Sequence, residues 1–140
     1  MPVPAAEPNL SPCILVVDDE DGIREIFAEA LRMTGYATFE ASNGQSALTQ
    51  LKSRNIDLLI TDILMPDMDG LELIMAARRA LPDLKVLAMS GGGRTAADVL
   101  INIARRLGVQ RTLAKPFELS DLLREVEALV GPPPEAADAS

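Results

Sequence analysis

The sequence contains no histidine and a single cysteine, Cys13. Without histidine, this chain cannot form a Ser-His-Asp or Cys-His catalytic centre, a histidine metal site or a phosphohistidine relay of its own. One cysteine excludes an intramolecular disulfide framework and is typical of proteins from a reducing compartment. Because Cys13 stands in an apolar run, we expect its thiol to be buried and unreactive.

Long apolar segments and an excess of positive charge are also missing. No run approaches the 18 or so apolar residues of a membrane-spanning helix, and residues 1–12 do not resemble a secretory signal. We therefore expect a cytoplasmic protein that does not bind membranes. The 13 basic and 21 acidic residues give a formal net charge of -8. This balance argues against direct nucleic-acid binding, because cationic side chains supply most of the affinity for phosphate backbones.

The remaining composition is that of one globular domain. The chain has 140 residues, of which 48% are hydrophobic and 24% charged, enough to form one core without disulfides or metals. Both ends are rich in proline and alanine and lack a core-forming pattern. We predict a folded domain over residues 13–130, with flexible tails at 1–12 and 131–140.

Inside the predicted domain, five short apolar runs alternate with five stretches of helical periodicity. Four of the runs show no alternation of polar and apolar residues, as is typical of strands buried on both faces of a parallel sheet. The run 37–41 is more polar, and we expect it at an edge. The pattern predicts an α/β fold in which helices cover both faces of a parallel sheet. The predicted strands are 13–17, 37–41, 57–61, 85–89 and 111–114, and the predicted helices include 23–31, 47–51, 71–81, 96–107 and 119–130.

Polar side chains stand at the ends of four predicted strands. Asp18 and Asp19 follow the first strand, Asp62 the third, Ser90 the fourth and Lys115 the fifth. In a doubly wound sheet the carboxyl ends of the strands share one edge, where ligands bind at the point of strand-order reversal. We therefore expect these side chains to converge there.

Three carboxylates at one edge require a cation or protons. At about 4 Å and an effective dielectric constant near 20, each pair repels by about 4 kcal/mol. Oxygen ligands without histidine or thiolate suit Mg²⁺. A divalent ion and the Lys115 ammonium around one carboxylate suit phosphoryl chemistry, with Asp62 as nucleophile and Asp18 and Asp19 holding the metal. Ser90 could donate a hydrogen bond to a phosphoryl oxygen.

The combination of these motifs resembles the receiver domain of two-component response regulators, in a stand-alone form similar to chemotaxis regulators. The resemblance covers residues 13–130, with the motifs in the family's order. It implies a flavodoxin-like, doubly wound, five-stranded parallel sheet with the arrangement (βα)5. The motifs that carry it are residues 16–20 (Val-Val-Asp-Asp-Glu), 62–70 (Asp-Ile-Leu-Met-Pro-Asp-Met-Asp-Gly), 90–91 (Ser-Gly) and 115–117 (Lys-Pro-Phe).

The resemblance implies a phosphoryl acceptor and a magnesium site. Asp62 is expected to accept a phosphoryl group from a histidine kinase or a phosphotransfer protein. Asp19, Asp62 and the backbone carbonyl of Leu64 are expected to coordinate Mg²⁺, and Asp18 to assist through a water molecule.

It also implies roles for residues on the last two strands. Lys115 is expected to pair with the phosphoryl group or the carboxylate, and Ser90 to be the switch hydroxyl that moves toward the phosphate. Pro116 is expected to follow a cis peptide bond.

Two features depart from the family pattern. Thr112 stands where the family commonly has an aromatic residue, three places before the lysine, and Phe117 on the other side need not replace it. The interval from Ser90 to Lys115 is longer than usual and contains glycines 91–93. We expect a mobile loop there, a displaced or irregular fourth helix, and an altered switch mechanism.

Three functions are compatible with these residues. The first is a signalling module that docks on an unidentified downstream protein, forms a phosphorylation-dependent homodimer, or acts as a phosphate sink, and whose catalysis is limited to its own phosphorylation and dephosphorylation. The second is a Mg²⁺-dependent aspartyl-phosphate phosphatase or phosphotransferase. Such enzymes typically need an acid/base carboxylate two residues after the nucleophile, where this chain has Leu64, which cannot transfer a proton. The third is an unphosphorylated interaction module, which the acidic pocket and Lys115 disfavour.

Overall fold

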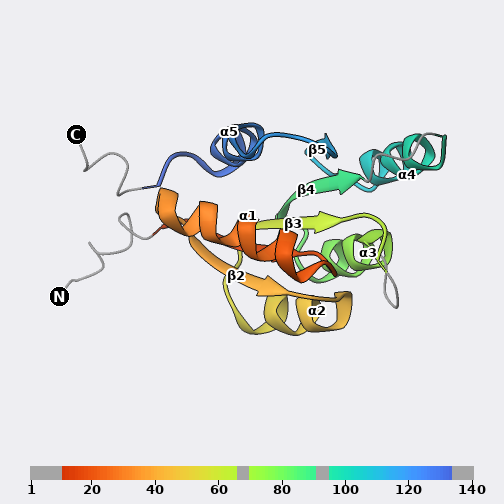
Figure 1. Cartoon of the computed structure of the whole chain (residues 1–140). Helices are drawn as coiled ribbons and strands as arrows, with labels where there is room; N and C mark the ends of the chain where they lie inside the picture. Colours follow the sequence, from red (N-terminus) through yellow and green to blue (C-terminus); the bar gives the residue numbers. More distant parts are fainter. Residues whose placement is uncertain (1–10, 66–69, 91–94, 134–140) are drawn as a thin grey trace.

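The computed structural model describes residues 11–65, 70–90 and 95–133 as a parallel sheet between two layers of helices (Figure 1). Most of the two predicted tails and the glycine run 91–93 lie outside these residues. The five strands pair in parallel in the order β2-β1-β3-β4-β5. They are β1 (Cys13–Val17), β2 (Ala37–Ala41), β3 (Leu58–Asp62), β4 (Lys85–Ser90) and β5 (Arg111–Ala114).

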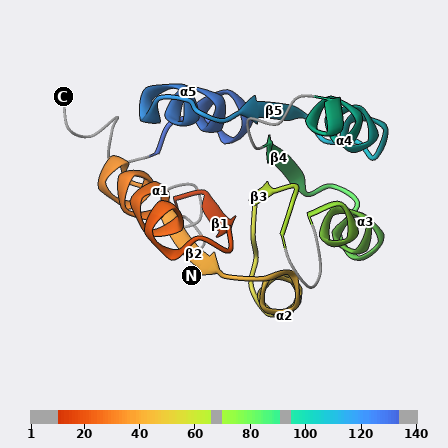
Figure 2. The same ribbon diagram turned by 45° about the vertical axis from the view of Figure 1, so that its right-hand side comes forward.

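Five helices connect and cover the strands. The helices α1 and α5 cover one face of the sheet, and α2, α3 and α4 cover the other (Figure 2). This confirms the predicted flavodoxin-like α/β fold. The helices are α1 (Asp21–Thr34), α2 (Gly44–Ser53), α3 (Gly70–Ala80), α4 (Thr95–Arg106) and α5 (Leu119–Val130).

The central strands supply side chains to both cores, which explains their continuous apolar sequence. In β1, Ile14 and Val16 pack with α1 and α5, whereas Leu15 and Val17 pack against α2 and α3. All four side chains are buried. A strand with helices on both faces gains from apolar residues at every position, so polar alternation disappears.

The strands β2 and β5 form the two edges of the sheet. The strand β2 lies at one edge, as predicted. The expectation that the fifth strand is buried on both faces is wrong, because β5 forms the other edge and none of its four residues is buried. An edge strand has a neighbour on one side only, and its apolar sequence does not reveal this position.

The helix α4 is also more regular than expected. It is an uninterrupted α-helix from Thr95 to Arg106. The fourth helix is therefore not irregular, and its expected displacement stays a prediction. Within the described residues, no helix is both long enough and apolar enough to cross a bilayer.

Candidate functional site

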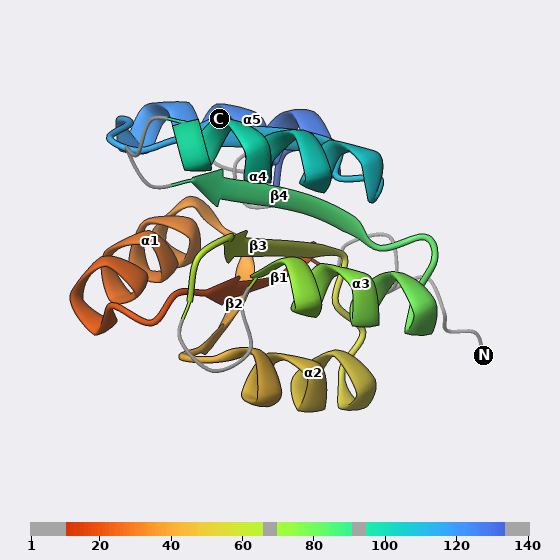
Figure 3. The same cartoon turned by 90° about the vertical axis from the view of Figure 1, so that its right-hand side faces the viewer.

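The carboxyl ends of the strands bring three predicted site carboxylates to one edge of the sheet. The arrowheads of β1, β3 and β4 all point to this edge in Figure 3. Asp18 directly follows β1 and is fully buried, and Asp62 is the last residue of β3 and is 7% exposed. Asp19 is exposed. Carboxylate oxygens of these three residues lie within 4.8 Å of one another, so the predicted convergence is confirmed.

Lys115 joins two of these carboxylates. Its Nζ atom lies 3.1 Å from Asp18 Oδ2 and 3.1 Å from Asp62 Oδ2, and it donates a hydrogen bond to each. Lys115 directly follows β5. Its backbone N–H donates to the Ser90 carbonyl at 2.9 Å, and this bond holds the Lys115 backbone beside the end of β4. The peptide bond between Lys115 and Pro116 is cis, as the resemblance implied.

Burial disfavours the charged forms of both Asp62 and Lys115, whereas the opposite charge of each residue favours the charged form of the other. Burial raises the pKa of the Asp62 carboxyl above its ordinary value, and the nearby Asp18 carboxylate raises it further, against the lowering effect of the Lys115 ammonium. Burial alone would lower the pKa of Lys115, but the Asp62 and Asp18 carboxylates outweigh it and the pKa is raised. Lys115 therefore stays charged at neutral pH, while the ionised form of Asp62 is destabilised.

Backbone groups orient the two buried carboxylates. The N–H of Glu20 donates to Asp18 Oδ1 at 2.9 Å, and the N–H of Leu64 donates to Asp62 Oδ1 at 3.3 Å. Each carboxylate therefore has one oxygen toward the backbone and the other toward Lys115. The Leu64 side chain is exposed, and its backbone N–H is the group of this residue that contacts Asp62.

The carboxylates fit Mg²⁺. All three offer hard oxygen ligands, a set that Mg²⁺ prefers, and one of them is exposed where a hydrated ion could approach. Lys115 neutralises only part of their charge. The assignment of Asp18, Asp19, Asp62 and the Leu64 carbonyl as metal ligands stays a prediction, as does that of Asp62 as the acceptor.

The residues of the predicted switch lie on β4 and β5. Ser90 ends β4 and is buried, one residue after the partner of Asp62 in the sheet register. Thr112 lies on β5 and is half-buried. The Phe117 ring stacks on Phe27 of α1, with ring centroids 5.4 Å apart. Phe117 thus belongs to the core between α1 and α5 and does not take the place of an aromatic residue at position 112.

Two residues that were not predicted as site residues contact the backbone of the site. Gly70, at the start of α3, lies so close to β3 that a Cβ atom there would be 2.1 Å from the Asp62 carbonyl oxygen. Arg24 of α1 donates from Nη1 to the Asp18 carbonyl oxygen at 3.0 Å. No motif identifies Arg24, because its guanidinium is held by Glu40, which lies 16 residues away on β2.

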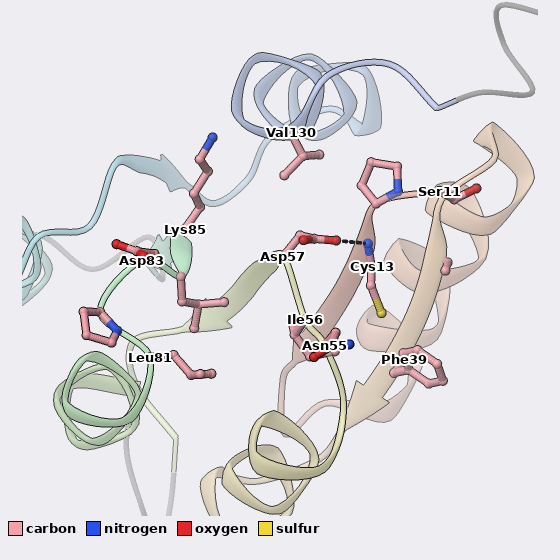
Figure 4. Close-up of a pocket in the computed structure, with 14 residues that line it drawn as sticks. Ser11, Cys13, Phe39, Asn55, Ile56, Asp57, Leu81, Asp83, Lys85 and Val130 are labelled. Atoms are coloured by element: carbon pink, nitrogen blue, oxygen red, sulfur yellow. Dashed lines mark hydrogen bonds between the residues drawn. The ribbon is translucent and has the colours of Figure 1, made fainter. Parts of the chain in front are cut away.

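A hollow lies at the opposite end of the strands from the carboxylates. It has a volume of about 930 Å³ and is lined by residues at and near the amino ends of β1, β2, β3 and β4 (Figure 4). Cys13 lines it and is half-buried, so the expectation of a buried thiol is wrong. Burial, together with the Asp57 carboxylate, nevertheless raises the pKa of the Cys13 thiol, and a protonated thiol is a poor nucleophile.

Comparisons with known proteins agree with this geometry. A family model described as the response regulator receiver domain matches residues 14–127. The chain belongs to this family. It is 37% identical over 117 residues to the response regulator receiver protein CpdR of Brucella abortus, covering 84% of this chain and 95% of that protein. It is 33% identical to sporulation initiation phosphotransferase F of Bacillus subtilis, covering 78% of this chain and 86% of the relative.

Solved receiver structures share the fold. The chemotaxis protein CheY4 of Vibrio cholerae superposes with a TM-score of 0.77 at 26% identity, covering 85% of this chain and 98% of that one. The receiver domain of NtrX from Brucella abortus superposes with a TM-score of 0.76 at 34% identity, covering 84% and 97%. Receiver domains generally bind Mg²⁺ through acidic residues, and the carboxylate cluster of this receiver is consistent with that and with aspartyl phosphorylation.

The packing of Gly70 generates a first prediction. Gly70→Ala should destabilise the domain by about 2 kcal/mol, because the added methyl group must displace the Asp62–Ile63 peptide. Gly22→Ala is the matched control, since a Cβ atom there meets nothing within 4 Å and alanine favours the helix. Chemical denaturation of both variants measures the difference. Equal stability of the two variants would contradict the close approach of α3 to β3.

The raised pKa of Asp62 generates a second prediction. In metal-free buffer at neutral pH, Asp62→Asn should raise the melting temperature by a few degrees, because it removes an ionised carboxylate that burial destabilises. Because the Asp62 pKa is higher in the native state than in the unfolded state, the native state binds the carboxyl proton more tightly. The destabilisation of the native state by ionised Asp62 therefore decreases as the pH falls through this raised pKa, and it is lost below the unfolded-state pKa of about 3.9. The difference between variant and parent should shrink over that window. A difference that grows with acidification would contradict the assigned direction.

Proposed function

We propose that this receiver accepts a phosphoryl group on Asp62 from a histidine kinase or a phosphotransfer protein, and that phosphorylation controls its interactions. The observation that supports this most directly is the Lys115 ammonium, 3.1 Å from both the Asp18 and the Asp62 carboxylates. It places a positive charge beside a carboxylate whose other charged neighbours, Asp18 and Asp19, are acidic. Such a site favours the arrival of a phosphoryl group together with a divalent cation.

In the proposed reaction, an oxygen of the Asp62 carboxylate attacks the phosphorus of a phosphohistidine on the donor protein. The O–P bond forms as the N–P bond breaks, and the donor imidazole leaves with the electron pair of that bond and is protonated from solvent. The product on this chain is an acyl phosphate. Lys115 can then pair with a phosphoryl oxygen, and Ser90 can donate its hydroxyl hydrogen to another.

The proposed magnesium ligands are Asp19, Asp62 and the backbone carbonyl of Leu64, with Asp18 acting through water. When bound, Mg²⁺ would supply positive charge that offsets the carboxylates and the phosphoryl oxygens. Asp18 is fully buried, whereas Asp62 is slightly exposed and Asp19 is exposed, which supports the assignment of Asp18 to an indirect role.

The proposed output is a change in protein–protein interaction. The receiver over residues 13–130 would act in the cytoplasm by docking on a downstream protein, by pairing with a second phosphorylated copy, or as a phosphate sink. Its only catalysis would be assistance to its own phosphorylation and hydrolysis. The name of sporulation initiation phosphotransferase F describes a protein that passes on phosphoryl groups, and this supports a donor or acceptor partner in a relay.

A third prediction tests the phosphoryl acceptor. Incubation with Mg²⁺ and acetyl phosphate should give a single acid-labile phosphoryl adduct by intact mass spectrometry, and Asp62→Asn should abolish it. Asp83→Asn is the matched control, because Asp83 is exposed at the opposite edge of the sheet and should leave the adduct unchanged. Rapid turnover of phosphomonoesters would instead favour a phosphatase, and no adduct with any donor would favour an unphosphorylated interaction module.

A fourth prediction concerns Lys115. In the presence of Mg²⁺, Lys115→Ala should remain folded but lose the phosphorylation-dependent change in backbone hydrogen exchange, because no cation links the acyl phosphate to the end of β5. Lys52→Ala, an exposed position on α2, should keep the change. A normal response in Lys115→Ala would remove Lys115 from the proposed role.

A further inference from the structure

Asp19 is the least constrained of the three site carboxylates. It is exposed, and among the described residues its carboxylate makes no hydrogen bond or ion pair, whereas Asp18 and Asp62 are both held by Lys115. No side chain in the described part of the chain holds the Asp19 carboxylate, so its reach toward the site depends on where the backbone places the Asp19 Cα–Cβ bond. A ligand that is aligned before the metal arrives loses less conformational entropy on binding.

Two hydrogen bonds bracket the backbone of Asp19. On one side, the N–H of Glu20 donates to Asp18 Oδ1 at 2.9 Å. On the other side, Arg24 Nη1 donates to the Asp18 carbonyl oxygen, the acceptor of the Asp18–Asp19 peptide, at 3.0 Å. The first bond comes from the local turn, and the second comes from a side chain on α1.

The Arg24 guanidinium is itself fixed. Its side chain is only 11% exposed, with Nε 3.1 Å from Glu40 Oε1 and Nη1 2.8 Å from Asp21 Oδ1. Glu40 lies on β2, and its other carboxylate oxygen pairs with Arg32 at 3.1 Å. Arg24 thus connects α1, β2 and the end of β1 at a single planar group, a task that suits arginine better than lysine.

We infer that Arg24 is a positioning residue of the magnesium site, which aligns Asp19 by holding the Asp18–Asp19 peptide. The inference rests on the proposed function, because it takes Asp19 as a metal ligand. Arg24 would not contact the ion, and its positive charge would by itself repel Mg²⁺. Removal of the Arg24 guanidinium therefore has two opposed effects. The electrostatic potential at the site becomes more attractive to Mg²⁺, and Asp19 becomes less ordered.

Arg32 provides a matched control for this inference. Like Arg24, it lies on α1, pairs with Glu40, and donates to a backbone carbonyl, that of Thr38 at 2.9 Å. None of its hydrogen bonds reaches Asp18 or Asp19. Arg24→Gln and Arg32→Gln remove the same charge and the same type of Glu40 contact. Arg24→Gln also removes the bond to the Asp18 carbonyl and an ion pair with the exposed Asp21 on α1 itself.

The test is isothermal titration of MgCl₂ into the unphosphorylated full chain, with circular dichroism to check folding. We expect Arg24→Gln to raise the Mg²⁺ Kd about tenfold, the lower range for residues that orient metal ligands, and Arg32→Gln to leave it equal to or slightly below the parent value. An Arg24→Gln Kd no higher than that of Arg32→Gln would overturn the inference. If Arg24→Gln does not fold, the same comparison is made between Arg24→Lys and Arg32→Lys, since the single ammonium cannot reproduce all three contacts.

A second measurement needs no metal and no phosphodonor. In metal-free protein, hydrogen exchange of a peptide spanning Asp18–Glu20 should be faster in Arg24→Gln than in Arg32→Gln, and equal exchange would count against positioning. Failure of the proposed function is distinguishable, because the parent would then bind no Mg²⁺ at millimolar concentrations or form no adduct on Asp62, and the first of these results would overturn both proposals.

Discussion

The mutual repulsion of the carboxylates at the end of the sheet is the constraint on which the site depends. Asp18 and Asp62 are buried, and taking two like charges out of water is unfavourable unless a cation accompanies them. Lys115 is that cation in the protein alone, and its single positive charge offsets only part of the charge of the carboxylates beside it. In the proposed function, the remaining negative charge would attract a divalent ion and, with that ion, a phosphoryl group.

The fold creates this constraint by its strand order. The reversal between β1 and β3 sends the connections from these neighbouring strands to opposite faces of the sheet, leaving an opening above their carboxyl ends. Asp18 and Asp62 lie at that opening because each stands at the end of its strand. The fifth strand lies at the far edge, but it places Lys115 at the site because the N–H of Lys115, the residue after β5, donates to the Ser90 carbonyl. The apolar strands thus serve to hold charged groups that would otherwise separate.

The sequence was sufficient to predict the sheet, its approximate strands and the meeting of Asp18, Asp19, Asp62 and Lys115. Those predictions depend on local apolar runs and on the rule that parallel strands share a carboxyl edge, both of which can be read along the chain. The incomplete burial of β5 and of Cys13 could not be predicted in this way, since each depends on what packs against a strand and not on the strand's own residues. The stacking of Phe117 on Phe27 joins residues 90 positions apart and likewise has no local signal. Arg24 was missed for a similar reason, because its partners are Glu40 on β2, the Asp18 carbonyl after β1 and Asp21 at the start of α1.

The central claim is that Asp62, and neither of its acidic neighbours, carries the phosphoryl group. Borohydride reduction of the phosphorylated protein, followed by peptide mass mapping, tests this most directly because it converts an aspartyl phosphate to homoserine. The account predicts homoserine at position 62 alone, and only after treatment with both Mg²⁺ and a phosphodonor. Homoserine at position 18 or 19, or at another acidic residue, would contradict it.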